Sequence, residues 1–236
     1  MESEGQALVK NILRTTLILV AAAACGGGGG EISESEAREA LPRMVIQEIQ
    51  LPEGLERAGE EFTTNEQLTE SGVGGAPEAA KIEEWGRVLG YETDFQAAEL
   101  PSGPLITGIA TAASAYKTPE GATASFEDTA QRARDADWAQ FYTDLTEFQE
   151  QEVQRDLPAD GVFWLRLSGL RARTGGEGHV LVVDDQIAYR VGPVRSFLRV
   201  LTSEEGATDR NLVVSRVEAL LRTQIQNTRE ALEELE

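Results

Sequence analysis

The run GVFWLRLSGLRARTGGEGHVLVVDDQIAYRVGPVRSFLRVLT at residues 161–202 is rich in the branched and aromatic residues that favour β-strands. It predicts strands at residues 162–168, 180–183, 186–194 and near 196–202. A glycine-rich loop, residues 174–178, joins the first two, and Asp184-Asp185 has the length of a two-residue hairpin connection between the next two. Connections this short predict an antiparallel meander.

The C-terminal segment carries one apolar stripe. From Val214 to Leu235, apolar or small residues recur at steps of three and four, which predicts an amphipathic helix beginning at about Asp209. We expect the stripe to lie across the meander. The alternative is a coiled-coil dimer formed through the same stripe.

The segment before the meander mixes helices and strands. Helices are expected at residues 41–49 and 77–88, and after Thr118-Pro119, where the threonine suits an N-cap and the proline a first helical position. Strands are expected at residues 90–95 and 105–116. Five residues fit one side of a further helix; they are Trp138, Phe141, Tyr142, Leu145 and Phe148. We interpret this aromatic stripe as a core face, with a ligand groove as the alternative.

These patterns define an α+β fold. We expect an antiparallel sheet or meander with helices packed on one face and a long C-terminal helix. Residues 41–236 would form a single domain, since a chain of this length and apolar content can bury one sizeable core.

The N-terminal segment has the organisation of an export signal. Lys10 and Arg14 precede a ten-residue uncharged run, Thr15–Ala24, which ends in four alanines. A membrane-spanning helix needs about 20 apolar residues, so this run fits the apolar part of a cleaved signal peptide at residues 1–24. Gly26–Gly30 and the acidic residues that follow predict a flexible tether over residues 25–40.

The end of the apolar run, Ala22-Ala23-Ala24-Cys25, resembles the lipobox of bacterial lipoproteins. The resemblance implies that signal peptidase II cuts before Cys25 and that a diacylglycerol is attached to this cysteine. It implies a lipid-anchored protein on the extracytoplasmic side of a bacterial cell membrane. The alternative is cleavage at an Ala-x-Ala site, which would leave Cys25 as a free thiol. Cys25 is the only cysteine, so no internal disulfide can form.

Two further strings are similar to those of a group of exported bacterial proteins of uncharacterised function. They are EFTTNE at Glu61–Glu66 and EWGRVLGYETDF at Glu84–Phe95. The resemblance implies an extracytoplasmic α+β domain and implies no activity.

The charge excludes one class of partner. Asp and Glu number 41 against 21 Lys and Arg, for a net charge of −20. Nucleic-acid binding requires clustered positive charge that attracts phosphates, so we expect no nucleic-acid partner. The acidity itself is typical of a highly soluble protein.

Motifs for catalysis, cofactors and metals are missing from the sequence. His179 is the single histidine, at the start of a predicted strand, where a surface or capping role is more common than catalysis. No His/Cys cluster suits zinc, no nucleophile elbow is present, and no phosphate-binding loop follows a strand. We therefore expect no catalytic residue, no metal and no cofactor.

Arginines form the remaining candidate site. Between residues 161 and 200, six arginines stand against three acids. Strand alternation predicts Arg166, Arg190 and Arg199 on the solvent face of one sheet, with Trp164 among them. Arginine beside an aromatic ring suits recognition of phosphate or carboxylate. The alternative is that these arginines pair with the protein's own acids.

The sequence therefore favours a membrane-anchored extracytoplasmic lipoprotein with a non-catalytic binding or sensing domain. Its expected partners are the membrane, through the lipid anchor, and an anionic envelope ligand or a protein. Two alternatives stay open: a structural or chaperone-like envelope lipoprotein, and a hydrolase that uses carboxylates.

Overall fold

The structure, a computed structural model, describes residues 31–70, 77–97, 105–173, 177–211 and 213–235. The predicted signal peptide, Cys25 and the glycine run lie outside these residues. Across the described segments the chain forms a seven-stranded sheet in the order β1-β2-β3-β7-β6-β5-β4, with every neighbouring pair antiparallel. The strands are β1 (Leu55–Thr63), β2 (Arg87–Ala97), β3 (Leu105–Tyr116), β4 (Leu145–Glu152), β5 (Gly161–Ala172), β6 (His179–Val191) and β7 (Val194–Glu205).

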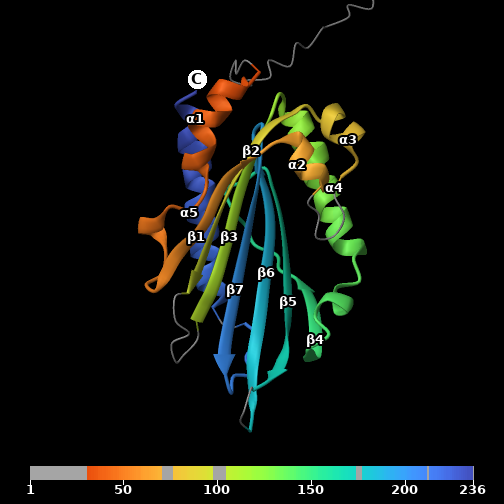
Figure 1. The fold of residues 1–236 in the computed structure, drawn as a ribbon, viewed down its shortest axis with the longest axis vertical. Helices are drawn as coiled ribbons and strands as arrows, with labels where there is room; N and C mark the ends of the chain where they lie inside the picture. The colour runs from red at the N-terminus through yellow and green to blue at the C-terminus, as the bar shows by residue number, and fades with distance from the viewer. Residues whose placement is uncertain (1–30, 71–76, 98–104, 174–176, 212, 236) are drawn as a thin grey trace, which may run out of the picture.

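Helices cover both faces of this sheet, as Figure 1 shows. Helices α1 (Glu34–Met44) and α5 (Val214–Glu233) pack on one face, and α4 (Pro119–Asp135) packs on the other. Short helical segments complete the chain: η1 (Glu48–Gln50), α2 (Asn65–Glu70), α3 (Ala79–Glu84) and η2 (Trp138–Phe141). The α+β class and the long C-terminal helix are confirmed, whereas the prediction that helices occupy one face only is wrong.

Helix α5 lies on the sheet through the predicted stripe. Val217, Leu221 and Ile225 are fully buried, in one cluster with Leu198 of β7 and Ile187 of β6. Several strands therefore contribute the apolar surface on which the stripe packs.

Helix α4 begins and packs as its sequence predicts. Thr118 Oγ1 accepts a hydrogen bond from the Gly121 backbone amide, and Pro119 occupies the first turn. Gly121 lets the helix approach the carbonyl of Trp85, because a Cβ there would lie 1.9 Å from that oxygen. Further along, Ala130 packs in a cluster with Phe163.

The folded domain begins earlier than predicted. Residues 34–40, which we expected in the flexible tether, belong to α1, whose N-terminus is closed by a reciprocal capping box between Ser33 and Glu36. Ala37 and Ala40 are each 1 % exposed. The capping box starts the helix and the two alanines bury one side of it, in a stretch whose composition is typical of a spacer.

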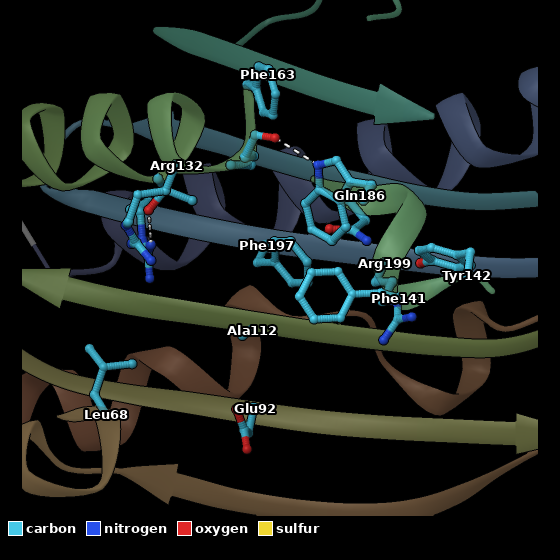
Figure 2. Close-up of a pocket in the computed structure, with 15 residues that line it drawn as sticks. Leu68, Glu92, Ala112, Arg132, Phe141, Tyr142, Phe163, Gln186, Phe197 and Arg199 are labelled. Carbon is cyan, nitrogen blue, oxygen red and sulfur yellow. Dashed lines mark hydrogen bonds between the residues drawn. The ribbon is translucent and has the colours of Figure 1, made fainter. Parts of the chain in front are cut away.

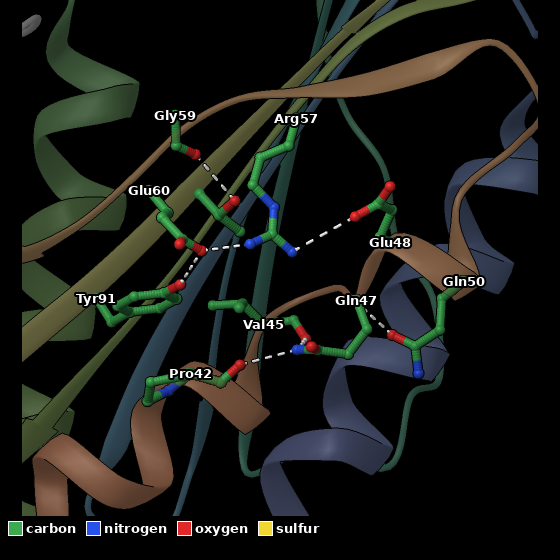
Figure 3. Close-up of polar contacts among 10 residues, drawn as sticks. Pro42, Val45, Gln47, Glu48, Gln50, Arg57, Gly59, Glu60 and Tyr91 are labelled. Atoms are coloured by element: carbon green, nitrogen blue, oxygen red, sulfur yellow. Dashed lines mark hydrogen bonds and ion pairs between the residues drawn. The ribbon is translucent and has the colours of Figure 1, made fainter.

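The segment after α1 is held to the sheet by polar contacts (Figure 3). Gln47 Nε2 donates to the Pro42 carbonyl at 2.8 Å and to the Val45 carbonyl, which satisfies acceptors at the end of α1. On the sheet, the Tyr91 hydroxyl donates to Glu60 at 2.8 Å, and Arg57 bridges Glu60 and the segment that follows α1. Burial, with the neighbouring carboxylate, raises the pKa of Tyr91 to about 12.

Two predicted elements differ from the structure. Asp184 and Asp185 do not form a turn; they lie in the middle of the continuous strand β6, and the turn falls after Val191. The aromatic segment from Trp138 is not one helix: η2 ends at Phe141 and strand β4 follows. In both cases residues distant in sequence decide the outcome. Arginines on other strands pair with the two aspartates, and α4 and β5 pack against the aromatic segment.

Candidate ligand-binding pocket

Strand β3 creates space beneath helix α4. Its residues alternate between the two faces of the sheet. Tyr116, the last residue of β3, packs against Ala122 of α4, whereas the preceding residues on the α4 side are all small. They are Gly108, Ala110, Ala112 and Ser114. The intervening residues, such as Ile109 and Ala113, are buried in the clusters on the α1 and α5 side. The sheet therefore has a hollow on the α4 face.

A pocket of about 530 Å³ occupies this hollow, and we call it the α4 pocket. Figure 2 shows Ala112 on the sheet, with Arg132 and Phe141 on the helical side. The lining residues come from α2, the sheet, α4 and the segment after it. They are Leu68, Glu92, Ala112, Thr129, Arg132, Ala133, Trp138, Phe141, Tyr142, Phe163, Gln186, Ala188, Arg195, Phe197 and Arg199.

Aromatic rings form much of the pocket wall. Trp138 is fixed by a 2.7 Å hydrogen bond from its Nε1 to the Ala133 carbonyl in the last turn of α4. Phe141 lies 6.0 Å from Trp138, centroid to centroid, and is 52 % exposed. Phe163 and Phe197 contribute rings from the sheet. The aromatic segment thus serves partly as core, through Trp138, and partly as a pocket wall, through Phe141.

At one end of the α4 pocket, the lining residues Arg199 and Tyr142 bind a buried carboxylate. Arg199 forms a bidentate pair with Asp184, with Nε–Oδ1 at 3.0 Å and Nη2–Oδ2 at 2.8 Å. The Tyr142 hydroxyl donates to the same carboxylate. Asp184 is 1 % exposed. Hydrogen bonding to Asp184 raises the pKa of Arg199, and burial together with that carboxylate raises the pKa of Tyr142. The charge of Arg199 is therefore already balanced within the protein.

Arg195 differs from Arg199 in its partners. Its Nη1 donates to Thr129 Oγ1 at 2.6 Å, while its buried Nε has no hydrogen-bond partner. Among the described residues, no carboxylate lies within 4.0 Å of Arg195, whereas Arg199 and Arg190 each have one. Of the described arginines that lack such a partner, Arg216 and Arg229 are exposed on α5, and the others are Arg195 and Arg87.

Arg87 lies on the same face of the sheet, close to Arg195. It is 4 % exposed and donates to three neutral acceptors: Thr63 Oγ1 at 2.8 Å, Asn65 Oδ1 at 2.9 Å and Ser114 Oγ at 3.4 Å. Burial, with a smaller contribution from the positive charge of Arg195, lowers the pKa of Arg87 to about 10. Two guanidinium groups thus lie near each other, and neither has a carboxylate within 4.0 Å among the described residues. Glu92 acts on Arg87 electrostatically without an ion pair.

The four residues predicted as a shared arginine face do not lie together. Arg166 and Trp164 point to the α5 side and are 2 % and 1 % exposed. Both donate to Asp185: Arg166 at 2.8 and 2.7 Å, and Trp164 Nε1 at 2.6 Å. The predicted solvent face is wrong because helices cover both faces of the sheet.

Arg190 and Arg199 do share the α4 side of the sheet, but each has an internal partner. Arg190 pairs with Asp160 at 3.2 Å, and Arg199 pairs with Asp184. The alternative interpretation, pairing with the protein's own acids, therefore describes all three predicted arginines. Of the four predicted residues, Arg199 alone lines the α4 pocket.

Sequence reasoning did not single out Arg195 and Arg87. Arg195, Phe197 and Arg199 are spaced two residues apart on β7, which places all three on one face of the sheet. Nothing in the pattern distinguishes a paired arginine from an unpaired one, because the partners come from distant segments.

Other chemistry in the described residues is limited. Glu92 is the carboxylate of the pocket lining, and burial, with the neighbouring Glu61 carboxylate, raises its pKa. His179 contacts the Ala207 carbonyl at 3.1 Å. Within the described segments, no group of three or more His, Cys, Asp or Glu side chains is placed to hold a metal ion. Each helix in these segments is too short or too polar to cross a bilayer.

Comparison with known proteins gives two distant similarities. No family model and no curated protein matches the chain. The extracellular domain of PknH from Mycobacterium tuberculosis is similar at a TM-score of 0.49 and 9 % identity, over 84 % of this chain and 99 % of that domain. An uncharacterised protein from Mycobacterium smegmatis is similar at 0.35 and 8 %, over 86 % and 98 %. At these values, neither similarity bears on activity or ligand.

Proposed function

We propose that the chain is a membrane-anchored extracytoplasmic lipoprotein whose domain binds a small organic molecule in the α4 pocket without transforming it. The location rests on the signal-like run ending at Cys25. The binding role rests on the pocket. These two supports are independent, so each has its own test.

The observation that carries the binding role is an aromatic wall facing a floor of alanines. Small-molecule sites are concave, about 300–1,000 Å³ in volume, and mostly apolar with a few placed polar groups. The α4 pocket has a volume of about 530 Å³, with Phe141, Phe163 and Phe197 as aromatic lining and with Arg195 and Gln186 as polar groups. Exposed apolar surface gathered in a concavity marks a binding site more often than scattered apolar residues do.

The lining gives less support to a hydrolase. Carboxylate-dependent glycoside hydrolysis uses two carboxyl groups on opposite sides of the scissile bond. Among the described lining residues, Glu92 alone provides a carboxylate to the α4 pocket, since Asp184 is buried beneath Arg199 and Tyr142. A structural or chaperone-like role would place the exposed ring of Phe141 in contact with a partner protein. Such a role would not require a pocket with a floor of alanines.

Filling the floor of the α4 pocket should abolish binding. We expect the neutral fluorescent probe phenylnaphthylamine to show saturable enhancement with the parent protein and none with Ala112→Phe, because the added ring occupies the hollow. Ala110→Phe is the matched control, since it adds the same ring to the same face of β3 outside the lining. Fluorescence titration measures both. A parent without saturable enhancement, or an Ala112→Phe variant that binds like the parent, contradicts the proposed binding role.

Removing Cys25 should release the protein from the membrane. We expect Cys25→Ser to move from the membrane pellet to the soluble extracytoplasmic fraction, because anchoring depends on acyl chains that only the cysteine carries. Cell fractionation with blotting measures the distribution. Retention of the variant in the pellet at the parental level would show that the anchor is elsewhere.

A further inference from the structure

We infer that the ligand of the α4 pocket carries an oxyanion, a carboxylate or a phosphate, on an apolar body, and that Arg195 with Arg87 behind it forms the anion-recognition end. This inference rests on the proposed binding role of the pocket and adds the chemical class of the ligand. It is separate from the arginine face expected from the sequence, whose members have internal partners.

The sheet register brings the two arginines together. Thr63, Gly90, Ser114 and Arg195 are successive partners across β1, β2, β3 and β7. The Arg87 guanidinium lies over Gly90, where a Cβ would be 2.1 Å from Nη2 and 3.1 Å from Ser114 Oγ. Glycine at this position therefore makes room for the guanidinium directly beside Ser114, the strand neighbour of Arg195.

In the part of the chain that the structure describes, neither charge of this pair has a hydrogen-bonded carboxylate. Buried or partly buried charges are normally paired, because an unpaired charge in a low-dielectric environment is costly. Among the described residues, Arg87 donates only to hydroxyl and amide oxygens. Arg195 donates to Thr129 and leaves its buried Nε–H without an acceptor. An oxyanion in the pocket would accept from Arg195 and balance the charge of both groups.

The rest of the pocket defines the other end of the ligand. Phe197 follows Arg195 on the same face of β7, with Ala112 as its partner on β3 and Ala188 as its partner on β6. Next along β7 comes Arg199, which Asp184 neutralises. A ligand with its acid group at Arg195 would thus lay an apolar body over Phe197, in contact with the other aromatic rings of the lining.

Two related dyes separate the anion site from the apolar pocket. Anilinonaphthalene sulfonate carries an oxyanion on the aromatic body of phenylnaphthylamine, which is neutral. We expect the parent to bind the sulfonate dye more tightly than the neutral dye. Added salt should weaken the binding of the sulfonate dye and leave the binding of the neutral dye unchanged. Arg195→Gln should raise the dissociation constant of the sulfonate dye by about tenfold or more, the effect of one charge-assisted hydrogen bond. The dissociation constant of the neutral dye should stay within about twofold of the parental value.

Arg190→Gln is the matched control. Arg190 is the strand partner of Arg195 on the same face, but it pairs with Asp160 and does not line the pocket. We expect this variant to bind both dyes like the parent. Gly90→Ala, which displaces the Arg87 guanidinium, should weaken the sulfonate selectively and to a smaller extent than Arg195→Gln. Thermal melting of each variant establishes that it is folded.

The outcomes distinguish the two proposals. If neither dye binds the parent, the binding role itself fails. If the neutral dye binds and the sulfonate binds no better, or if Arg195→Gln weakens both dyes equally, the pocket remains and the anion site is wrong. Competition by decanoate and by decyl phosphate, with decanol as the neutral comparison, then identifies which oxyanion the site prefers; displacement by decanol as strong as by both acids would also overturn the anion site.

Discussion

Replacing Asp185 with alanine is expected to lower the free energy of unfolding by about 3–5 kcal/mol, because it leaves a buried guanidinium without its counter-ion. Asp185 is fully buried and accepts hydrogen bonds from Arg166 and Trp164, all on the α5 side of the sheet. For a domain of this size, that loss corresponds to a fall in Tm of roughly 6–20 °C. Thermal and denaturant melts measure it.

Two comparisons isolate the cause of that loss. Asp144→Ala removes one partner of the exposed pair Arg171–Asp144, whose side chains are 50 % and 57 % exposed, and should cost no more than about 1 kcal/mol. The double variant Arg166→Met/Asp185→Leu removes both buried charges and should recover most of the stability. An Asp185→Ala protein as stable as Asp144→Ala would show that the buried pair does not have the role assigned to it.

Truncating Leu221 to alanine is expected to cost about 2–5 kcal/mol, the range for a buried leucine that leaves a cavity. Leu221 is fully buried where α5 crosses the sheet, in the cluster that includes Leu198 and Ile187. Arg229→Ala, on the exposed side of the same helix, should change stability by no more than about 0.5 kcal/mol. Denaturant melts of both variants test this assignment. Equal effects would show that Leu221 is not buried against the sheet.

The apolar periodicity of the sequence predicted most of the sheet and α5 correctly. Strand alternation in β5, β6 and β7 follows from side chains that face two packed layers, and the α5 stripe matches the face that is buried. The predicted turn at Asp184 and Asp185 is wrong, although adjacent acids are common in turns. In the structure they point to opposite faces, one to Arg199 and one to Arg166, and these distant partners allow two charges inside a strand.

The segment from Trp138 to Phe148 shows a similar limit. Its aromatic spacing fits a helix, but Tyr142 and Phe148 instead stack across the start of β4, at 5.5 Å between ring centroids. Glu147, with φ of 51°, falls at a register shift in that strand and bends it. Short aromatic runs cannot distinguish these two solutions locally, because packing against α4 and β5 decides between them.

The candidate site was the least predictable part. Arginine content and strand alternation indicated that arginines gather on this sheet, and they do, on both faces. Which of them lacks a carboxylate depends on acids brought in from other segments, such as Asp160 for Arg190. Arg87 and Arg195 stand out because no carboxylate in the described part of the fold forms an ion pair with them. Sequence periodicity carries no information about such pairing.

A crystal structure of the protein with bound anilinonaphthalene sulfonate tests the central claim most directly. The account predicts the dye in the α4 pocket, with the sulfonate within hydrogen-bond distance of Arg195 and the rings against Phe197 and Phe163. A dye seated on the α1 and α5 side, or one in the α4 pocket with its sulfonate directed away from Arg195 into solvent, would contradict it.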